Sequence, residues 1–526
     1  MRSFRALLPI TAVLALAGTL LAAPVAAGRE ARPEVRAVTR SVVHADPVDS
    51  SQERPTSFDV FSRGSRPPTS PPRSGDVVGR GPSAPSVTFG FDALADLDGF
   101  FPSDTVGALG ETVYVTAVNS SIGIYSAADG SVVLPRRTLG SLSGEPGFLQ
   151  FDPKVIHDPY ANMFLVVWLG FDDAPQRSTI FALAIPDATA ADTGTWCLTS
   201  LLGDQVPGDG AQWADYPGVG YDEDRVTITT NQFSFANAFR YAQVMSIDKT
   251  LYDCDQPTPV PVVFGGSQTR DRNGLQAFTL QPAQTVGTGG GAQLLLSFEL
   301  VRGRFDYLTI WRIKPTASGL ELKKGTVPTG KVSLPPPGTQ GGGGVSNADL
   351  FWDAGDERLV NAFYDADRDE LYAAHAVRVN LKPDSVTGSY PESAVRWYEI
   401  DPANKLPNSV LVRKGLIGTA EADLGWPTVA TDANGNLFVT YSRASSPLGE
   451  FLSAWVAEIP PGSTTATQLL MRPGLATYDA SSGVERWGDY TGINRSPLAP
   501  QSMATFNQYA ATTTTWQQVV HAVTHT

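Results

Sequence analysis

The stretch Trp487-Gly488-Asp489-Tyr490-Thr491-Gly492-Ile493 decides the fold, because it occurs a second time, nearly intact, as Trp213-Ala214-Asp215-Tyr216-Pro217-Gly218-Val219. Two segments this similar indicate a structural repeat in which Pro217 and Thr491 occupy the same position. Other segments follow the same course, with an aromatic or Asp-Pro turn, then a glycine or aspartate turn, then a β-branched run. Their anchors are Pro102, Pro153, Ala348 and Pro427, with a degenerate copy at Pro282.

Seven such units recur at an interval of about 65 residues, which is typical of propeller blades built from short strands and turns. Runs such as Val226–Thr230, Leu294–Phe298 and Leu437–Tyr441 are β-branched or aromatic and are bounded by turn formers. Length alone would allow two domains, but the repetition favours one. We therefore expect an all-β chain in which residues 87–526 form a seven-bladed β-propeller. Either Val87–Phe91 or Trp516–Val520 would supply the strand that joins the first blade to the last.

Two segments precede the expected propeller. Residues 1–27 carry Arg2 and Arg5, an apolar run and small residues at the end, which predicts an export signal peptide. Residues 28–86 are rich in Pro, Arg, Ser and Gly, and we expect a disordered linker, with a cell-wall spacer, a pro-segment and a plain solvated tail as alternatives. No later run is long and apolar enough for a transmembrane helix, so a secreted, extracellular protein is expected.

The net charge, the cysteines and the histidines limit which partners, cross-links and metal sites are expected. The formal net charge is −14, and the acid excess lies after residue 86, so nucleic acid is not an expected partner. In an exported protein the only two cysteines, Cys197 and Cys254, are expected to form a disulfide. The five histidines show no spacing that suits zinc.

The motif Arg486-Trp487-Gly488-Asp489-Tyr490 and the Asp-Pro-x-Val segment at Asp152 resemble those of exported bacterial β-propeller proteins of the sialidase-like, BNR-like group. The resemblance covers residues 87–526 and implies the fold. Its members range from glycan-cleaving enzymes to pure binding modules, so it implies no single function. The chain departs from true sialidases, because it lacks a Ser-x-Asp-x-Gly-x-x-Trp box and an assignable set of three arginines for a sialic acid carboxylate.

In a propeller, the segments that enter the innermost strands converge at one end of the central channel. Asp215 and Asp489 occupy equivalent positions, and Asp104, Asp152 and Asp349 lie within one to three residues of that position in their own units. Several carboxylates are therefore expected to share one mouth. The aromatic residues expected around them are Trp213, Tyr216, Trp426, Trp487 and Tyr490.

Carboxylates beside aromatic rings suit a sugar site, in which rings stack on sugars and paired acids act as acid, base or nucleophile. We expect Asp489 and Asp215 to be the leading catalytic residues, with Glu485 and Tyr490 assisting. Arg486 would clamp the substrate, and Trp487, Trp213, Trp426 and Tyr216 would bind it. Crowding of like charges would raise at least one carboxyl pKa.

The sequence leaves two alternative roles open for these aspartates and aromatic residues. An aspartate before a strand often caps a turn, and a neighbouring aromatic often packs between blades. Convergent carboxylates also suit a structural Ca²⁺, although no cofactor is required.

Two function classes follow. The first is a secreted propeller that engages an extracellular polysaccharide or glycan, as a glycoside hydrolase or lyase acting at the central funnel. The second is a non-catalytic extracellular binding propeller. A monomer is expected in both cases.

Overall fold

The computed structural model describes residues 38–44, 84–97, 99–190, 195–206, 211–288, 293–298, 305–342, 350–381, 391–402, 409–481 and 483–526. The predicted signal peptide lies outside the described residues, as does most of the predicted linker. Strands dominate the described part, so the prediction of an all-β chain is confirmed. Helices there are short, namely α1 (Leu139–Ser143), α2 (Asp187–Ala190) and the 3-10 helix η1 (Lys249–Tyr252). No helix of this part could cross a bilayer.

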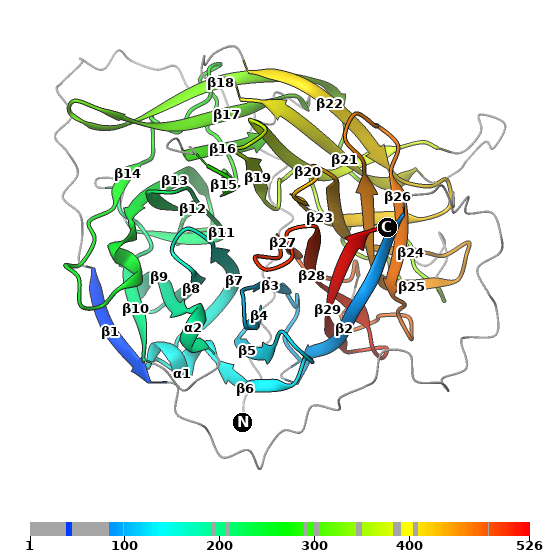
Figure 1. Ribbon diagram of the computed structural model, residues 1–526, viewed down its shortest axis with the longest axis horizontal. Coiled ribbons are helices and arrows are strands. Elements are labelled where there is room, and N and C mark those ends of the chain that lie inside the picture. Colours follow the sequence, from blue (N-terminus) through cyan, green and yellow to red (C-terminus); the bar gives the residue numbers. More distant parts are fainter. Residues whose placement is uncertain are drawn as a thin grey trace. The chain divides into compact units, whose positions relative to one another are not determined.

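The strands follow the chain in antiparallel groups of four (Figure 1). The first group is β3 (Val106–Leu109), β4 (Val113–Val118), β5 (Ser121–Ser126) and β6 (Val132–Thr138). The second is β7 (Leu149–Asp158), β8 (Met163–Asp173), β9 (Gln176–Pro186) and β10 (Thr195–Leu202). The sixth is β23 (Asp423–Thr431), β24 (Leu437–Ser445), β25 (Glu450–Ile459) and β26 (Thr467–Arg472).

The three middle groups are joined into one twelve-stranded sheet, because their first strands pair in parallel, β11 with β15 and β15 with β19. One group is β11 (Gln212–Tyr221), β12 (Arg225–Ser234), β13 (Phe239–Asp248) and β14 (Val262–Phe264). The next is β15 (Gln281–Val286), β16 (Gln293–Phe298), β17 (Phe305–Thr316) and β18 (Gly319–Val332). The last is β19 (Ala362–Asp365), β20 (Glu370–Val379), β21 (Glu392–Asp401) and β22 (Val410–Ile417).

The seventh group combines β2 with the last three strands of the described chain. It has the order β2 (Pro85–Ala95), β29 (Trp516–His525), β28 (Ser502–Ala510) and β27 (Gly492–Arg495). The two segments expected to join first and last units pair with each other, since Phe91 lies opposite Val520. Strand β2 is therefore the outermost strand of the sheet that contains the last three strands of the chain.

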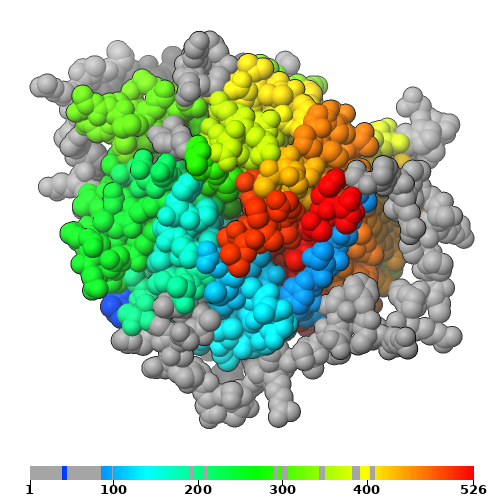
Figure 2. All heavy atoms as spheres, viewed as in Figure 1, coloured from blue at the N-terminus to red at the C-terminus, as the bar shows by residue number. Residues whose placement is uncertain are grey.

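The first strands of the groups contact one another in sequence order, β3 with β7, β7 with β11, and so on to β23 with β27. β27 in turn contacts β3 and β7, which brings the end of the chain against its beginning (Figures 1 and 2). Because neighbouring sheets cover them, strands such as β4 and β24 are buried along their whole length. Large aromatic residues fill the space between sheets, including Trp168, Trp311 and Trp397.

The entries to several first strands share one backbone feature. Asp104, Asp152, Tyr216, Thr279 and Trp426 all have left-handed φ angles between 50° and 55°. This conformation is uncommon for residues other than glycine, so its recurrence marks equivalent positions. It confirms the alignment of Pro153, Pro217 and Pro427, each of which follows such a residue.

Two of the expected anchors are wrong. The residue after the left-handed position is Thr105 in the first group and Leu280 in the fourth, whereas the sequence pattern favoured Pro102 and Pro282. The sequence alignment relied on proline as the marker of each unit. The turn is defined by the left-handed backbone conformation, which does not require a proline after it. The anchor at Ala348 lies outside the described residues.

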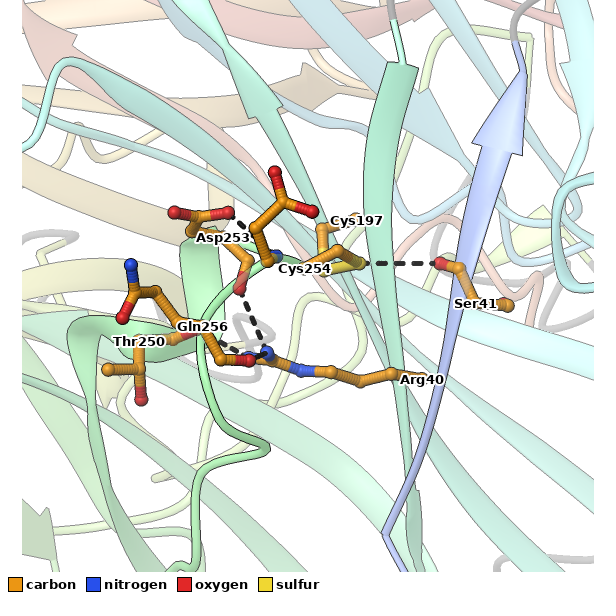
Figure 3. The surroundings of a disulfide bond; sticks show 8 residues. Arg40, Ser41, Cys197, Thr250, Asp253, Cys254 and Gln256 are labelled. Carbon is orange, nitrogen blue, oxygen red and sulfur yellow. Dashed lines mark hydrogen bonds between the residues drawn. A yellow bond between two sulfur atoms is a disulfide. The ribbon is translucent and has the colours of Figure 1, made fainter.

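A disulfide joins Cys197 on β10 to Cys254, just after η1, which confirms the predicted pairing (Figure 3). Beside it lies β1 (Thr39–His44), which pairs antiparallel with β10 as a fifth strand of that sheet. For these six residues the prediction of a disordered linker does not hold. The reason is that β10 is an edge strand whose backbone can pair with a short β-branched segment.

Candidate functional site

The candidate site lies at the segments that lead into two of the first strands, β7 and β11. Tyr216 lies at a bulge in β11, where the register shifts between Asp215 and Gly218. Asp152 lies at a matching bulge in β7, between Phe151 and Lys154. A bulge redirects side chains out of the regular alternation of a strand. Here it brings residues from separate groups into contact.

Asp104, Asp152, Asp215 and Asp489 form what we call the acid cluster. The Asp104 carboxyl accepts hydrogen bonds from the backbone N–H of Asp489 at 2.7 Å and from the Asn119 side chain at 2.7 Å. The Asp152 carboxyl lies near enough for its charge to raise the Asp104 pKa. Asp104 is fully buried and Asp152 nearly so.

Two tyrosines of the repeated motif tie the cluster together. The Tyr490 hydroxyl donates to Oδ2 of Asp152 at 3.0 Å, and the backbone N–H of Tyr216 donates to the same oxygen at 3.2 Å. The Tyr216 hydroxyl donates to the carbonyl oxygen of Asp489 at 3.2 Å. Both copies of the motif therefore contribute to one hydrogen-bonded network.

Burial raises the pKa of three of these carboxyls, because each loses hydration that would stabilise its charge. The pKa of Asp104 rises well above its ordinary value, through burial and then through the charges of Asp489 and Asp152. Burial and the Asp489 charge also raise the Asp152 pKa. The pKa of Asp215 rises to about 7, through burial and then through Asp152. Asp215 is the member that stays partly exposed to solvent.

Lys154 is a buried cation beside the acids. Its Nζ lies 3.4 Å from the centroid of the Tyr490 ring and 5.7 Å from that of Tyr216. Burial lowers its pKa to about 7, although the charges of Asp152, Asp104 and Asp489 act in the opposite direction. A lysine in this state can hold or release a proton near neutral pH.

Two arginines border the acid cluster, and both are held by acids. Arg486 donates to both carboxylate oxygens of Asp489, at 3.0 and 3.1 Å, and lies 3.9 Å from Asp353. Arg358 donates from Nε to both oxygens of Asp356 and lies 4.3 Å from the centroid of the Tyr216 ring. Both side chains keep some exposure. The guanidinium of Arg486 therefore orients Asp489, and its expected role as a substrate clamp stays a prediction.

The structure gives Glu485 different partners from those expected of a catalytic acid. Its side chain is fully buried, and Oε2 accepts hydrogen bonds from the N–H groups of Ala480 and Ser481 and from the Ser481 hydroxyl. A carboxylate bound in this way fixes a turn. The charge spacing in the sequence could not reveal this, because the 480–481 turn is set by tertiary packing.

The expected aromatic platforms divide into two kinds. Trp487 is buried, donates from Nε1 to the Ser442 hydroxyl at 2.9 Å, and packs edge-on against Tyr478. Trp426 is also buried and donates to the carbonyl oxygen of Asp353 at 2.7 Å. Both pack between sheets and offer no stacking face. Trp213 is partly exposed.

Trp213 belongs to a chain of partly exposed rings that we call the aromatic ridge. Its members are Phe171, Trp213, Phe233, Phe235, Phe239 and Phe278. Neighbouring ring centroids lie 5.0 to 5.6 Å apart along it, from Phe171 through Trp213, Phe233 and Phe239 to Phe278. Arg358 connects the ridge to the acid cluster, because it lies 6.0 Å from Phe278 and 4.3 Å from Tyr216.

A small cavity lies beside the cluster along the first strands. Lys154, Gln281, Asn361 and Thr428 are among the residues that line it, and its volume is about 30 Å³. This space suits water rather than a sugar. The exposed parts of Asp215, Arg358 and Arg486 lie outside the lining of this cavity.

The cluster does not resemble a metal site. Within the described ranges, no three His, Cys, Asp or Glu side chains are grouped so that they could hold a metal ion. The Asp104 and Asp152 carboxyls instead bind backbone N–H groups, an asparagine and a tyrosine.

The sequence pattern missed three residues of the site. Lys154 follows the Asp-Pro pair that defined one anchor, so its place was visible although its role was not. Asp353 and Arg358 precede β19 in the segment whose expected acid was Asp349, which lies outside the described residues. No repeated motif marks these two.

Comparison with known proteins supplies similar structures but no relatives in sequence. No family model and no curated protein matches the chain. A protein of unknown function from Dyadobacter fermentans aligns with TM-score 0.40 at 9% identity, covering 72% of this chain and 95% of that one. An α-L-arabinofuranosidase from Fusarium graminearum aligns with TM-score 0.37 at 10% identity, covering 84% and 98%. Extracellular domains 1-2 of Drosophila Semaphorin 1b align with TM-score 0.33 at 8% identity, covering 84% and 87%.

Proposed function

We propose that the chain is an exported seven-bladed β-propeller of the sialidase-like group that hydrolyses a neutral extracellular glycan at the acid cluster. The succession of contacts from β3 to β27 and back to β3 supports seven blades, with β2 tying the last sheet to the start of the propeller. Residues 1–27 would direct export. The protein would act as a monomer outside the cell and would need no cofactor.

One observation carries this proposal: carboxyls from three different entry segments, Asp104, Asp152 and Asp489, lie close enough to one buried lysine for their charges to act on its pKa. Burying ionisable groups and crowding like charges both cost stability, because hydration is lost and the charges repel. Apolar residues would pack the same space at lower cost. Strongly perturbed carboxyls beside solvent are typical of sites that move protons.

The cluster offers two carboxyls in different surroundings, one with a raised pKa and one paired with an arginine, and glycoside hydrolysis uses two carboxyls with separate roles. Asp215, partly exposed and with a pKa of about 7, would donate a proton to the glycosidic oxygen as the bond to the sugar breaks. Asp489, bound by Arg486, would act as base on the attacking water or as the nucleophile. Tyr490 and Asp104 would hold this arrangement in place.

The aromatic ridge would carry the glycan beyond the cleaved bond. Partly exposed aromatic rings present apolar faces on which sugar rings can stack. Asp215 and the acidic balance of the whole chain disfavour anionic polymers. A neutral substrate also argues against a lyase, because lyases act on uronic acid polymers.

The test is a panel of neutral and anionic polysaccharides incubated with the purified protein. New reducing ends without absorbance of unsaturated products are expected from at least one neutral member. Asp215→Asn and Asp489→Asn should each abolish release, and Asp173→Asn, at an exposed aspartate, should not. The anomeric configuration of the first product would show whether Asp489 acts as base or nucleophile.

A non-catalytic binding propeller is the second candidate. It is favoured by the ion pairs that already engage Arg486 and Arg358, and by the water-sized cavity. Retention by one immobilised glycan, with no products from any polymer in the panel, would replace the first proposal with this one.

A further inference from the structure

The edge of the second sheet holds an extended segment of the same chain. β1 pairs with β10 over six residues, from Thr39 opposite Ser200 to His44 opposite Thr195. In Figure 1, β1 lies outside β10, and both belong to the sheet that begins at β7. An edge strand offers unpaired N–H and C=O groups that any extended peptide can use.

Arg40 adds a contact that depends on its side chain. One terminal nitrogen of its guanidinium donates to the carbonyl oxygens of Asp253 at 2.8 Å and Gln256 at 2.9 Å. The other donates to the carbonyl oxygen of Thr250. Three converging carbonyls form a receptor for a planar group with several N–H donors, and the single ammonium of lysine matches them less well.

The disulfide holds this receptor against the strand edge. Cys197 belongs to β10, and Cys254 lies between two of the residues whose carbonyls bind Arg40 (Figure 3). Sγ of Cys254 also lies 3.7 Å from the carbonyl oxygen of Ser41. The cross-link therefore fixes the distance between the strand edge and the guanidinium receptor.

Apolar contacts also hold the segment that contains β1 against the neighbouring sheets. Val43 packs on the core between the first and second sheets, and Val38 packs on the core between the second and third. By contrast, Ser41 and Val42 are exposed. Recognition thus rests on backbone pairing, one arginine and two valines.

We propose that the β10 edge and the 249–256 turn form a peptide-binding site that accepts an extended, arginine-bearing strand, and that Thr39–His44 occupies it as a separable ligand. None of these contacts requires the chain to be continuous between β1 and β2. Continuity only raises the effective concentration of the segment. A break in the connection would leave the N-terminal fragment bound until it exchanges with a free peptide of the same sequence.

The experiment uses the full mature chain with a specific protease site inserted after residue 60. After cleavage, gel filtration and mass spectrometry follow whether the N-terminal fragment stays with the body. A fluorescent copy of residues 36–46, added in excess, measures the exchange rate. Arg40→Ala and Arg40→Lys are compared with Ser41→Ala, whose exposed side chain is the matched control.

We expect the wild-type and Ser41→Ala fragments to co-elute with the body. The Arg40→Ala fragment should dissociate about tenfold faster or more, because hydrogen bonds from a charged group are lost. Arg40→Lys should lie between them. Immediate loss of the wild-type fragment would overturn the proposal, and so would equal retention of Arg40→Ala. An unchanged unfolding transition of the body would show that each variant is folded.

Discussion

The rings of Tyr216 and Tyr490, which come from the two copies of the repeated motif, lie with their centroids 4.8 Å apart. Their hydroxyls bind different acceptors. Tyr490 donates to the carboxyl of Asp152, whereas Tyr216 donates to the backbone carbonyl of Asp489. The same residue type thus binds an ionisable carboxyl in one copy and a backbone carbonyl in the other.

This difference predicts unequal effects of removing each hydroxyl. Tyr490→Phe should lower the free energy of unfolding at pH 8 by about 1.5–3 kcal/mol, because its hydrogen bond reaches an ionisable group. Tyr216→Phe should cost about 1 kcal/mol. Chemical denaturation of both variants measures the two values. Equal losses would mean that the Asp152 carboxyl gains little from Tyr490.

The raised pKa of Asp215 predicts that the Asp215→Asn substitution stabilises the protein while abolishing its activity. A carboxyl whose pKa rises to about 7 on folding contributes stability that is full below about pH 4 and is lost as the pH rises through 7. Asp215→Asn removes the ionisation. The variant should therefore match the wild type at pH 4 and exceed its free energy of unfolding by on the order of 2–4 kcal/mol at pH 8.

Denaturation at both pH values measures this change, with Asp173→Asn as the exposed control. The control should shift little at either pH. A less stable Asp215→Asn protein at pH 8 would show that the ionised carboxylate stabilises the fold, and the stability cost of Asp215 would no longer support a catalytic role.

The tryptophans of the repeated motif should differ in the same assay. Trp487→Ala empties a fully packed position and should cost about 3–5 kcal/mol. Trp213→Ala removes a partly exposed ring of the aromatic ridge, so it should cost less stability but reduce glycan binding. Affinity electrophoresis on the polysaccharide selected by the panel measures that binding. Unchanged retention of Trp213→Ala would remove the ridge from the proposed site.

The repeat predicted which acids meet, because strand entry points converge whenever units are arranged in sequence around one axis. Asp104, Asp152, Asp215 and Asp489 follow from that rule, whereas Asp349, which the rule also named, lies outside the described residues. The repeat did not predict which aromatic residues are buried and which are exposed. Whether a tryptophan is buried depends on the neighbouring sheet, and Ser442 and Tyr478, which enclose Trp487, are not part of its motif.

The sequence repeat also did not predict contacts that occur in one unit only. Lys154 carries its charge in a position that holds Gly218 and Thr428 in other units, so averaging over repeats hides it. β1 lies in a segment whose composition predicts disorder. It forms a strand because an edge and a receptor for Arg40 are present in the folded body, which no local signal in residues 39–44 describes.

Removal of the disulfide tests how far the second and third groups depend on it. Cys197 and Cys254 are 57 residues apart, and closing a loop of this size contributes about 4 kcal/mol in the chain-entropy model. The double Cys→Ala variant should lose about 2–4 kcal/mol of unfolding free energy. Because the same cross-link positions the carbonyls that bind Arg40, the variant should also release the cleaved N-terminal fragment faster, as Arg40→Ala does. A loss of stability with unchanged fragment release would mean that η1 and its turn hold the receptor without the cross-link.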